Sequence, residues 1–337
     1  MPTRGSRDKL DGKTLYATVG DKCHKITSEG HEVVPELQCQ QEEADGRLLF
    51  HAAHAAKEGF QAVVISSEDT YVFIMSVAFH DKIGAPLFQK FHSKTRRRVV
   101  DVRKVAGSLG ISTCRALLGM HAYTGCDTTS AFAGKGKSSA LKLLTTDRDV
   151  TEMFLQVGQD WDLSSELMDQ LEAFTCRIYA PKTLSTEVNA LQYHLFCAKK
   201  GEMESHQLPP CRDCLVKHAQ RANYQAAIWR RCFEKDPKVP SPVGRGWKNV
   251  KVEGKDELRV DWMDGQPAPD AMLDLLACKC TRKCELPRCV CLVNGLMCTD
   301  MCKLKDCDNR PSDDDINQSD TDEDEDDEED EEDEEYN

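Results

Sequence analysis

The chain contains 337 residues and carries a formal net charge of −14, and its length allows one substantial domain with smaller modules attached. Its apolar runs fall short of the roughly eighteen residues that a membrane-spanning helix needs, which excludes that class. The charge is uneven, because residues 312–337 hold eighteen acidic and no basic residues, leaving 40 acids and 44 bases elsewhere. A weakly basic body with an acidic tail is an asymmetry that indicates nucleic-acid partners.

The first predicted elements are a hairpin, a helix and a strand. Residues 13–27 alternate in polarity around Gly20-Asp21, which predicts a β-hairpin. Residues 41–60 have helical periodicity with acids in the first turn, and the apolar run 62–65 predicts a buried parallel strand that ends in an acidic turn. This order is typical of an α/β domain whose site lies at the carboxyl ends of its strands.

Further along, a basic segment precedes a long helical region. Residues 94–105 are basic and then strand-like, and the run 94–98 is either a nuclear localisation signal or, as we favour, an exposed edge strand. Helical patterns follow up to Gly125, after the Gly134-Lys135-Gly136 turn, and from Val150 to Cys232. Cys211, Cys214 and His218 lie in the last of these patterns. They are either half of a zinc site or, as we favour, residues that pack on an apolar helix face.

The composition changes again after the helices. Frequent proline and glycine predict a linker, and the acidic C-terminus cannot bury apolar surface. The tail serves either to compete with DNA or bind basic chromatin partners, or simply to keep the chain in solution. The predicted organisation is an α/β domain at 1–150, a helical extension at 151–235, the linker at 236–275, a cysteine-rich module at 276–310 and a disordered tail at 311–337.

Eight cysteines occur within about thirty residues in the pattern C-x-C-x3-C-x4-C-x-C-x6-C-x3-C-x4-C. They are Cys278, Cys280, Cys284, Cys289, Cys291, Cys298, Cys302 and Cys307. The thiolates of a C-x-C pair diverge, which favours a cluster in which thiolates bridge neighbouring metals. The segment has few large apolar residues, so bound metal would supply its folding energy. Disulfides are the alternative, but the chain opens on a polar segment rather than on an apolar signal sequence.

The spacing, together with the N-G-L-x-C-T run at 294–299 and the closing C-x-N at 307–309, resembles the tesmin-type CXC domain, a zinc-cluster module of chromatin and DNA-binding proteins. The resemblance implies three zinc ions on nine cysteines. This chain has Leu304 at the position of one of the nine. We therefore expect one metal to be missing or to be bound by Asp306, Asp308 or water.

Four acids lie at the ends of predicted elements. Glu43 and Asp45 open a helix, Asp69 follows the predicted buried strand, and Asp127 follows the helix that ends at Gly125. Carboxylates that converge repel one another, and Mg²⁺ or Mn²⁺ relieves this cost while activating water for phosphodiester hydrolysis. Taken singly, each acid is more typical of a solvated first turn or loop than of a metal site.

The motifs E-A-D at 43–45, S-E-D-T at 67–70 and G-C-D at 125–127, followed by a G-x-G turn, occur in an order that resembles the flap-endonuclease branch of the PIN-like nucleases. The resemblance implies a parallel sheet flanked by helices, with catalytic acids at Glu43, Asp45, Asp69 and Asp127 and a DNA phosphate at Gly134 and Gly136. Tyr71 stands where that family has a further aspartate, and its acidic first strand is not evident. We therefore expect a truncated domain or a decayed nuclease. The pairing with a CXC module is also similar to animal reading frames of suspected mobile-element origin.

Together these features predict a nuclear protein whose zinc module docks on DNA. The phosphate contacts would come from the basic residues among the cysteines, namely Lys279, Arg282, Lys283, Arg288, Lys303 and Lys305. A structure-specific nuclease using Mg²⁺ or Mn²⁺ remains open at this stage. The alternatives are a non-catalytic chromatin or protein-interaction adaptor with a PIN-like scaffold, and a cytosolic zinc-dependent adaptor.

Overall fold

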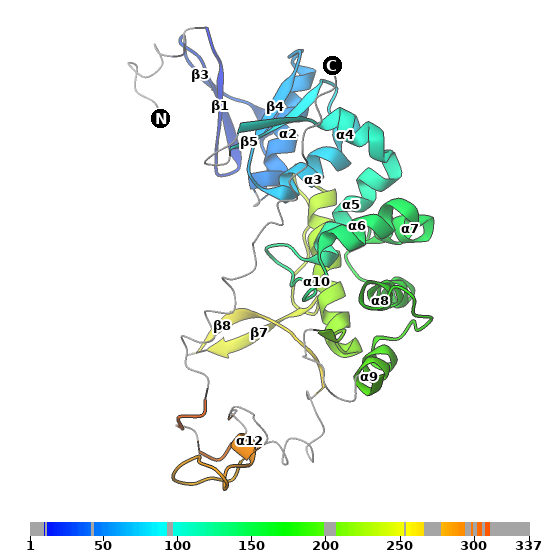
Figure 1. The fold of residues 1–337 in the computed structure, drawn as a ribbon. Coiled ribbons are helices and arrows are strands. Elements are labelled where there is room, and N and C mark those ends of the chain that lie inside the picture. The colour runs from blue at the N-terminus through cyan, green and yellow to red at the C-terminus, as the bar shows by residue number, and fades with distance from the viewer. Residues whose placement is uncertain are drawn as a thin grey trace. The chain divides into compact units, whose positions relative to one another are not determined.

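The computed structural model describes residue 10 and residues 12–41, 44–92, 97–198, 207–252, 254–265, 278–293, 298, 302–304 and 307–310 (Figure 1). The chain divides into two compact units, a first unit at Met1–Asp264 and a C-terminal unit at Gly265–Asn337. Among the described residues, no helix has both the length and the apolar character needed to cross a membrane. The predicted disordered tail at 311–337 lies outside the described residues.

The first unit opens on a small antiparallel sheet. Its strands are β1 (Leu15–Val19), β2 (Lys22–Ile26) and β3 (His31–Val33), in the order β1-β2-β3. Gly20 forms the turn between β1 and β2 with a φ of 61°, a conformation that glycine adopts without a steric cost. The hairpin predicted from the alternating pattern at 13–27 is therefore confirmed. A 3-10 turn, η2 (Pro35–Leu37), follows and leads into the helical part of the unit.

A second sheet carries the α/β part of the unit. Its elements in chain order are α2 (Ala44–Lys57), β4 (Val63–Ser66), α3 (Thr70–Ala78), the 3-10 turn η3 (His80–Lys82), β5 (Leu87–His92) and β6 (Arg97–Asp101). The strand order is β4-β5-β6, in which β4 pairs parallel to β5 and β5 pairs antiparallel to β6. The mixed α/β class is confirmed. The described strands contain one parallel pair rather than the parallel sheet of a PIN-like fold.

β4 and β6 are the edge strands of this sheet. β4 was expected to be buried, but it lies at an edge and its Val64 side chain is 56% exposed, while Ile65 is buried. An apolar run of this length cannot distinguish an edge strand from a central one, which explains the error. At the other edge, β6 begins at Arg97, in agreement with the edge-strand interpretation of the basic run; residues 94–96 lie outside the described residues.

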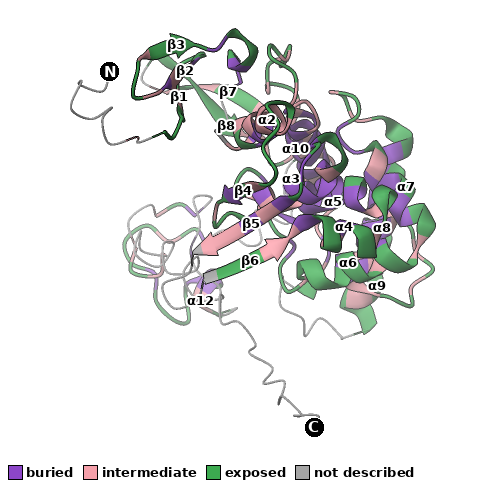
Figure 2. Ribbon diagram, turned by 90° about the horizontal axis from the view of Figure 1, so that it is seen from above, coloured by how far each residue is buried: buried purple, intermediate pink, exposed green. Residues whose placement is uncertain are grey.

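The helices that follow β6 pack together with α2 and α3 around a single core, and Figure 2 colours its buried residues purple. Asp101 caps α4 and Asp147 caps α7, since each carboxylate accepts hydrogen bonds from two backbone amides of the first turn. The predicted break at Gly125 is observed as the end of the central helix. The helices after β6 are α4 (Val102–Leu109), α5 (Ile111–Thr124), α6 (Lys137–Thr146), α7 (Arg148–Gln156), α8 (Ser165–Tyr179), α9 (Val188–Ala198) and α10 (Arg212–Arg230).

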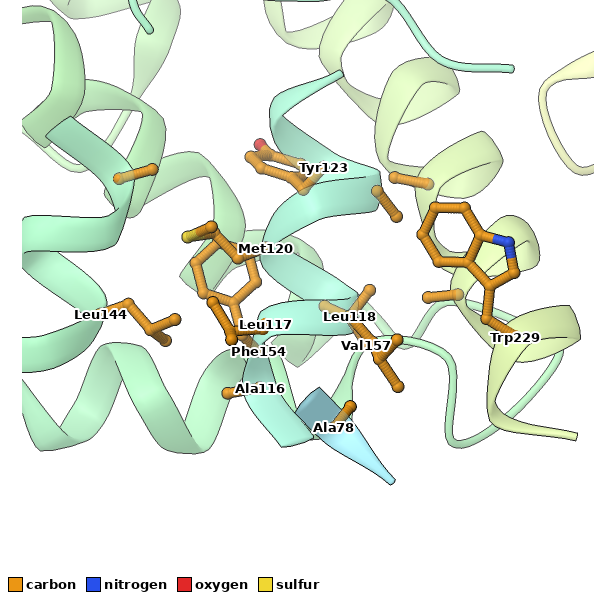
Figure 3. Packing of buried hydrophobic residues seen from close by; sticks show 14 of the residues in the cluster. Ala78, Ala116, Leu117, Leu118, Met120, Tyr123, Leu144, Phe154, Val157 and Trp229 are labelled. Carbon is orange, nitrogen blue, oxygen red and sulfur yellow. The ribbon is translucent and has the colours of Figure 1, made fainter. Parts of the chain in front are cut away.

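Helix α5 is the centre of this core. Its last nine residues, from Ala116 to Thr124, are all buried, so the helix is covered on every side. Figure 3 shows Met120 facing Leu144 and Phe154, whereas Leu118 lies toward Val157 and Trp229. Residues of the predicted helical extension at 151–235 therefore share one core with residues of the predicted α/β domain at 1–150. A helix that is apolar all round needs neighbours on all faces, and the later helices provide them.

The segment predicted as a linker at 236–275 contains regular structure. Strands β7 (Trp247–Val252) and β8 (Lys255–Val260) form an antiparallel hairpin within the first unit. The guanidinium of Arg221 in α10 attaches the hairpin, because Nη1 donates to the carbonyl oxygens of Gly246 at 3.1 Å and Asp261 at 3.0 Å. The prolines and glycines on either side of β7 are typical of a linker, and the alternating pattern of the strand is too short to outweigh them.

The C-terminal unit has little regular structure in its described part. It contains one short helix, α12 (Val290–Val293). Its core consists of six buried cysteines, and the partly buried Leu292 and Leu304 pack against them. Sulfur atoms thus occupy the place that apolar side chains occupy in the first unit.

A candidate metal centre

The structure brings all eight predicted metal-binding cysteines together. Cys280 and Cys307 are half-buried, and the other six are buried, Cys289 and Cys302 completely. None of the eight, all of which the structure describes, forms a disulfide. Seven of the thiol groups lie within 4.8 Å of one another in overlapping sets, and the Sγ atom of Cys302 lies 3.6 Å from that of Cys291, as expected for metal-binding thiolates.

Three of the thiol groups form a nearly equilateral triangle. The Sγ atom of Cys278 lies 3.7 Å from that of Cys284 and 3.9 Å from that of Cys298, and Cys284 and Cys298 are 3.8 Å apart. Two thiolates bound at about 2.3 Å to one tetrahedral zinc are themselves about 3.8 Å apart. Each edge of the triangle thus has the length expected for two sulfur atoms on one zinc, and each corner thiolate could be shared by two metals.

The remaining cysteines lie along the edges of this triangle. The edge between Cys278 and Cys284 has two further thiol groups within 4.8 Å, those of Cys280 and Cys289. The edge between Cys278 and Cys298 has Cys289 and Cys291, and Cys302 lies 3.6 Å from Cys291. The edge between Cys284 and Cys298 has Cys307 alone among the described histidines, cysteines and acids. Two edges can therefore complete a four-sulfur site, whereas the third has three sulfur atoms.

Backbone and amide groups hold the sulfur atoms in place. The backbone N–H of Cys278 donates to the Sγ atom of Cys302 at 3.4 Å, and Nδ2 of Asn309 donates to the Sγ atom of Cys298 at 3.3 Å. The backbone N–H of Cys298 donates in turn to the carbonyl oxygen of Asn309 at 2.7 Å. The closing C-x-N motif thus orients one corner of the triangle, in the way that outer-shell groups orient metal ligands.

Burial makes several of the gathered thiols harder to ionise, whereas Cys289 differs: burial acts against its ionisation, but hydrogen bonds from the backbone at Leu292 and Cys291 lower its pKa to about 7. Burial, followed by hydrogen bonding with Cys302, raises the pKa of the Cys291 thiol to about 11. Burial and the neighbouring thiol of Cys278 also raise the pKa of Cys284 above its ordinary value. A metal ion must displace these protons, so metal binding should release protons and weaken as the pH falls.

The basic residues predicted to contact DNA lie between the cysteines along the chain. Lys305 lies outside the described residues. One of the others, Lys283, is 4.0 Å from the Glu285 carboxylate, a spacing that stabilises little at an exposed site. The five that the structure describes are all exposed, namely Lys279, Arg282, Lys283, Arg288 and Lys303.

The predicted acidic site is described only in part, because Glu43 lies outside the described residues. Asp45 lies in the first turn of α2 and accepts a hydrogen bond from the Tyr71 hydroxyl group. Asp69 precedes α3 and accepts a hydrogen bond from Ser67 Oγ at 3.3 Å, and Asp127 is exposed after α5. These three carboxylates do not form a group within 4.8 Å of one another in the described part of the chain. A Mg²⁺ or Mn²⁺ site stays a prediction.

Two aromatic residues that the sequence patterns did not indicate lie near this position, Trp229 beside Tyr71 and His121 beside Trp229. The Tyr71 ring is stacked on Trp229 with centroids 5.8 Å apart and planes 11° apart, and His121 lies 5.8 Å from Trp229 on the indole. Burial, with a smaller effect from Lys137, lowers the pKa of His121 to about 4. Nothing in the spacing of these residues along the chain could have shown that they meet.

The structure also shows the surroundings of Gly134, Gly136 and His218. Gly134 has a φ of 63° and Gly136 precedes α6; both are exposed. His218 is buried and its Nε2 lies 2.7 Å from the carbonyl oxygen of Tyr123, so this ring is engaged in the core beside α5. It is therefore held away from a zinc site with Cys211 and Cys214, in agreement with the structural interpretation of that pair.

Comparisons with protein-family models, with curated proteins and with solved structures find no match for this chain.

Proposed function

We propose that the C-terminal unit is a zinc-cluster module that binds duplex DNA, and that the chain acts as a nuclear DNA-associated protein. The observation that carries the proposal is the triangle of sulfur atoms formed by Cys278, Cys284 and Cys298, whose edges have the length of a shared tetrahedral site. Zinc would be held by these three thiolates as bridges and by the other five as terminal ligands. It would supply the folding energy that this unit lacks.

The donor set favours zinc over other metals. Soft thiolate ligands select Zn²⁺, Cu⁺ or iron–sulfur clusters, whereas Mg²⁺ and Mn²⁺ prefer oxygen donors. Sulfur-only tetrahedral sites are typical of structural zinc, and the backbone N–H donors found here stabilise the charge of bound thiolates. The cluster would be structural, because its sulfur atoms are mostly buried.

The exposed cations support DNA as the partner. Five of them occur in a small unit whose core is cysteine, and long cationic side chains contact phosphates without reading the base sequence. Such a surface predicts binding that depends on salt and little on sequence. The first unit would then act as a scaffold, since Tyr71 occupies the Asp45 carboxylate that a nuclease would need for metal.

A second function without DNA keeps the zinc cluster. In this alternative the chain is a chromatin or protein-interaction adaptor, and the acidic tail binds basic partners. The two functions differ in a measurable way, because the adaptor needs no affinity of the zinc module for duplex DNA.

The experiment measures binding to duplex DNA by residues 1–311. The protein is first loaded with zinc and then treated with a chelator. Binding should require zinc, weaken steeply with salt, and fall for all sequences alike in the double variant Arg282→Glu and Lys283→Glu. The matched control is Lys251→Glu with Lys255→Glu, two exposed lysines of the β7–β8 hairpin. Absence of binding at low salt by the zinc-loaded chain would leave the adaptor as the function.

A further inference from the structure

Two thiol groups of the first unit lie together at the start of α10. Cys211 is the N-cap residue of this helix and Cys214 stands three residues later, in the first turn. An N-cap side chain lies over the third residue of its helix, as in a capping box, and the Cys214 thiol is accordingly hydrogen-bonded to the Cys211 sulfur. Both residues are half-buried and neither forms a disulfide. They are therefore a close pair of thiols that solvent reaches.

The other cysteines of the first unit differ from this pair. Cys126 and Cys197 are not buried, but the hydrogen-bond partners of Cys126 are two threonines, and that of Cys197 is Tyr193. Packing explains the remaining five, which are all buried, namely Cys23, Cys39, Cys114, Cys176 and Cys232.

Neighbouring helices fix the turn that carries the pair. The backbone N–H of Arg212 donates to Oδ1 of Asn189 in α9 at 2.9 Å. The Arg212 guanidinium also forms an ion pair with the buried Glu172 of α8. A disulfide between the two cysteines would therefore close within a turn that is already ordered, so that little further conformational entropy is lost.

The two sulfur atoms are not equivalent. Cys211 lies at the N-terminal end of the helix, where the backbone dipole favours negative charge, and its side chain makes no capping hydrogen bond. Burial, followed by the hydrogen bond with Cys211, raises the pKa of the Cys214 thiol to about 11. Cys214 therefore keeps its proton at neutral pH, and Cys211 is the better placed of the two to react as a thiolate.

We propose that Cys211 and Cys214 are a redox-active dithiol that exchanges with small disulfides of the glutathione class. The Cys211 thiolate attacks one sulfur of the disulfide, so that this bond breaks, a mixed disulfide forms and one glutathione leaves as a thiolate. Cys214 then loses its proton to water and attacks the Cys211 sulfur, which forms the Cys211–Cys214 disulfide and releases the second glutathione thiolate. The chain loses two electrons, and the glutathione disulfide gains them.

The experiment incubates the zinc-loaded full chain with mixtures of reduced and oxidised glutathione. The remaining thiols are alkylated, and each cysteine is assigned by mass spectrometry after digestion with trypsin. Trypsin cleaves after Arg212, so the two cysteines fall into the separate peptides 201–212 and 213–217. The disulfide should appear as a linked pair of these peptides, whose share rises with the share of oxidised glutathione and is lost on addition of dithiothreitol.

Three variants separate the roles of the thiols. Cys214→Ser should accumulate a mixed disulfide with glutathione at Cys211, because no second thiol resolves it. Cys211→Ser should lose both the linked peptides and any mixed disulfide at Cys214, whose thiol stays protonated. Serine is itself a good N-cap residue, so this variant should remain folded. Cys126→Ser is the matched control at a cysteine that is also half-buried, and it should leave the linked peptides unchanged.

Three outcomes would overturn the inference. If both cysteines stayed open to alkylation at every glutathione ratio, the pair would have only a structural role. Equal reaction of Cys211, Cys126 and Cys197 with glutathione would show that accessibility alone decides the exchange. A linked peptide that joins Cys211 to Cys197 would assign the disulfide to a different pair. The metal count of the C-terminal unit tests the proposed zinc cluster separately, because neither cysteine belongs to that unit.

Discussion

Tyr71 shows how one residue changes the chemistry of a site. Its hydroxyl group donates to the Asp45 carboxylate and its ring is stacked on Trp229. An aspartate at this position would add a second negative charge near Asp45 and favour a divalent cation. Tyrosine instead satisfies the carboxylate with a neutral donor, so that no metal is needed to relieve repulsion.

We expect the unmodified chain to lack metal-dependent nuclease activity. Hydrolysis by paired metals needs enough carboxylates to fix both ions, and the described acids are not gathered. Cleavage of flap and single-stranded DNA with Mn²⁺ measures this, for the unmodified chain and for Tyr71→Asp. Robust cleavage by the unmodified chain that disappears in Asp69→Asn and in Asp127→Asn would contradict the expectation. Tyr71→Phe is the control, which should cost about 1 kcal/mol of stability through the lost hydrogen bond.

His121 should make the stability of the first unit depend on pH. The ring is 3% exposed, its Nδ1 atom has no hydrogen-bond partner in the described structure, and its pKa is lowered to about 4 by burial. The unfolded chain therefore binds a proton that the folded chain does not. This contribution to stability is complete above the unfolded pKa of about 6.5, and is lost as the pH falls toward 4.

Replacing His121 with phenylalanine should flatten the acid side of the stability profile. The change removes at most roughly 3 kcal/mol of pH dependence between about pH 6.5 and 4. His218, with a pKa also lowered to about 4 by burial, should leave a residual slope. Urea unfolding at several pH values measures this, with the exposed His194→Phe as control. An unchanged slope in His121→Phe would show that the ring is already charged or accessible in the folded state.

At the scale of elements, the β7–β8 hairpin depends on one close approach. Gly246 has a φ of 85°, and a Cβ atom there would lie 2.5 Å from the carbonyl oxygen of Lys217 and 2.6 Å from Cγ of Arg221. Both neighbours belong to α10. The hairpin can therefore lie against this helix only because the contact residue has no side chain.

Gly246→Ala should destabilise the first unit more than Gly244→Ala. Gly244 has a similar φ of 83° but an added Cβ would meet nothing within 4 Å, so its cost should be limited to backbone strain of about 1 kcal/mol. Gly246→Ala adds the steric conflict with α10, and should cost about 2 kcal/mol or more. Chemical denaturation of both variants measures the difference. Equal costs would mean that the hairpin moves away from α10 without loss.

At the scale of the whole molecule, opposite charges are separated along the chain. The module with five described, exposed cations is followed by residues 312–337 with eighteen acids and no bases. Charges tethered in one chain compete with a ligand of the same sign for the same surface, and salt screens this competition beyond a Debye length of about 8 Å at physiological ionic strength.

Deleting residues 312–337 should tighten DNA binding at low salt, and the gain should shrink as salt is added. A tail of the same length in which every Asp and Glu is replaced by Asn and Gln is the matched control, and should behave as the deletion does. Fluorescence anisotropy with a labelled duplex measures both. If the neutral tail bound DNA as weakly as the acidic tail, the effect would be steric rather than electrostatic.

Local patterns were sufficient for features that depend on nearby residues. The alternation around Gly20 predicted the hairpin, the glycine at 125 predicted the end of α5, and the cysteine spacing predicted a gathered set of thiols. Each of these follows from backbone preferences or from donors close in sequence, so little depends on the rest of the chain.

The tertiary structure alone decided the features that depend on distant residues. It placed β4 at an edge, brought Trp229 of α10 against Tyr71 of α3, and made Cys278, Cys284 and Cys298 the corners of one triangle. Spacing along the chain does not specify which thiol groups are equidistant or which strand lacks a neighbour. Those properties arise when packing fixes the positions of segments that the sequence keeps far apart.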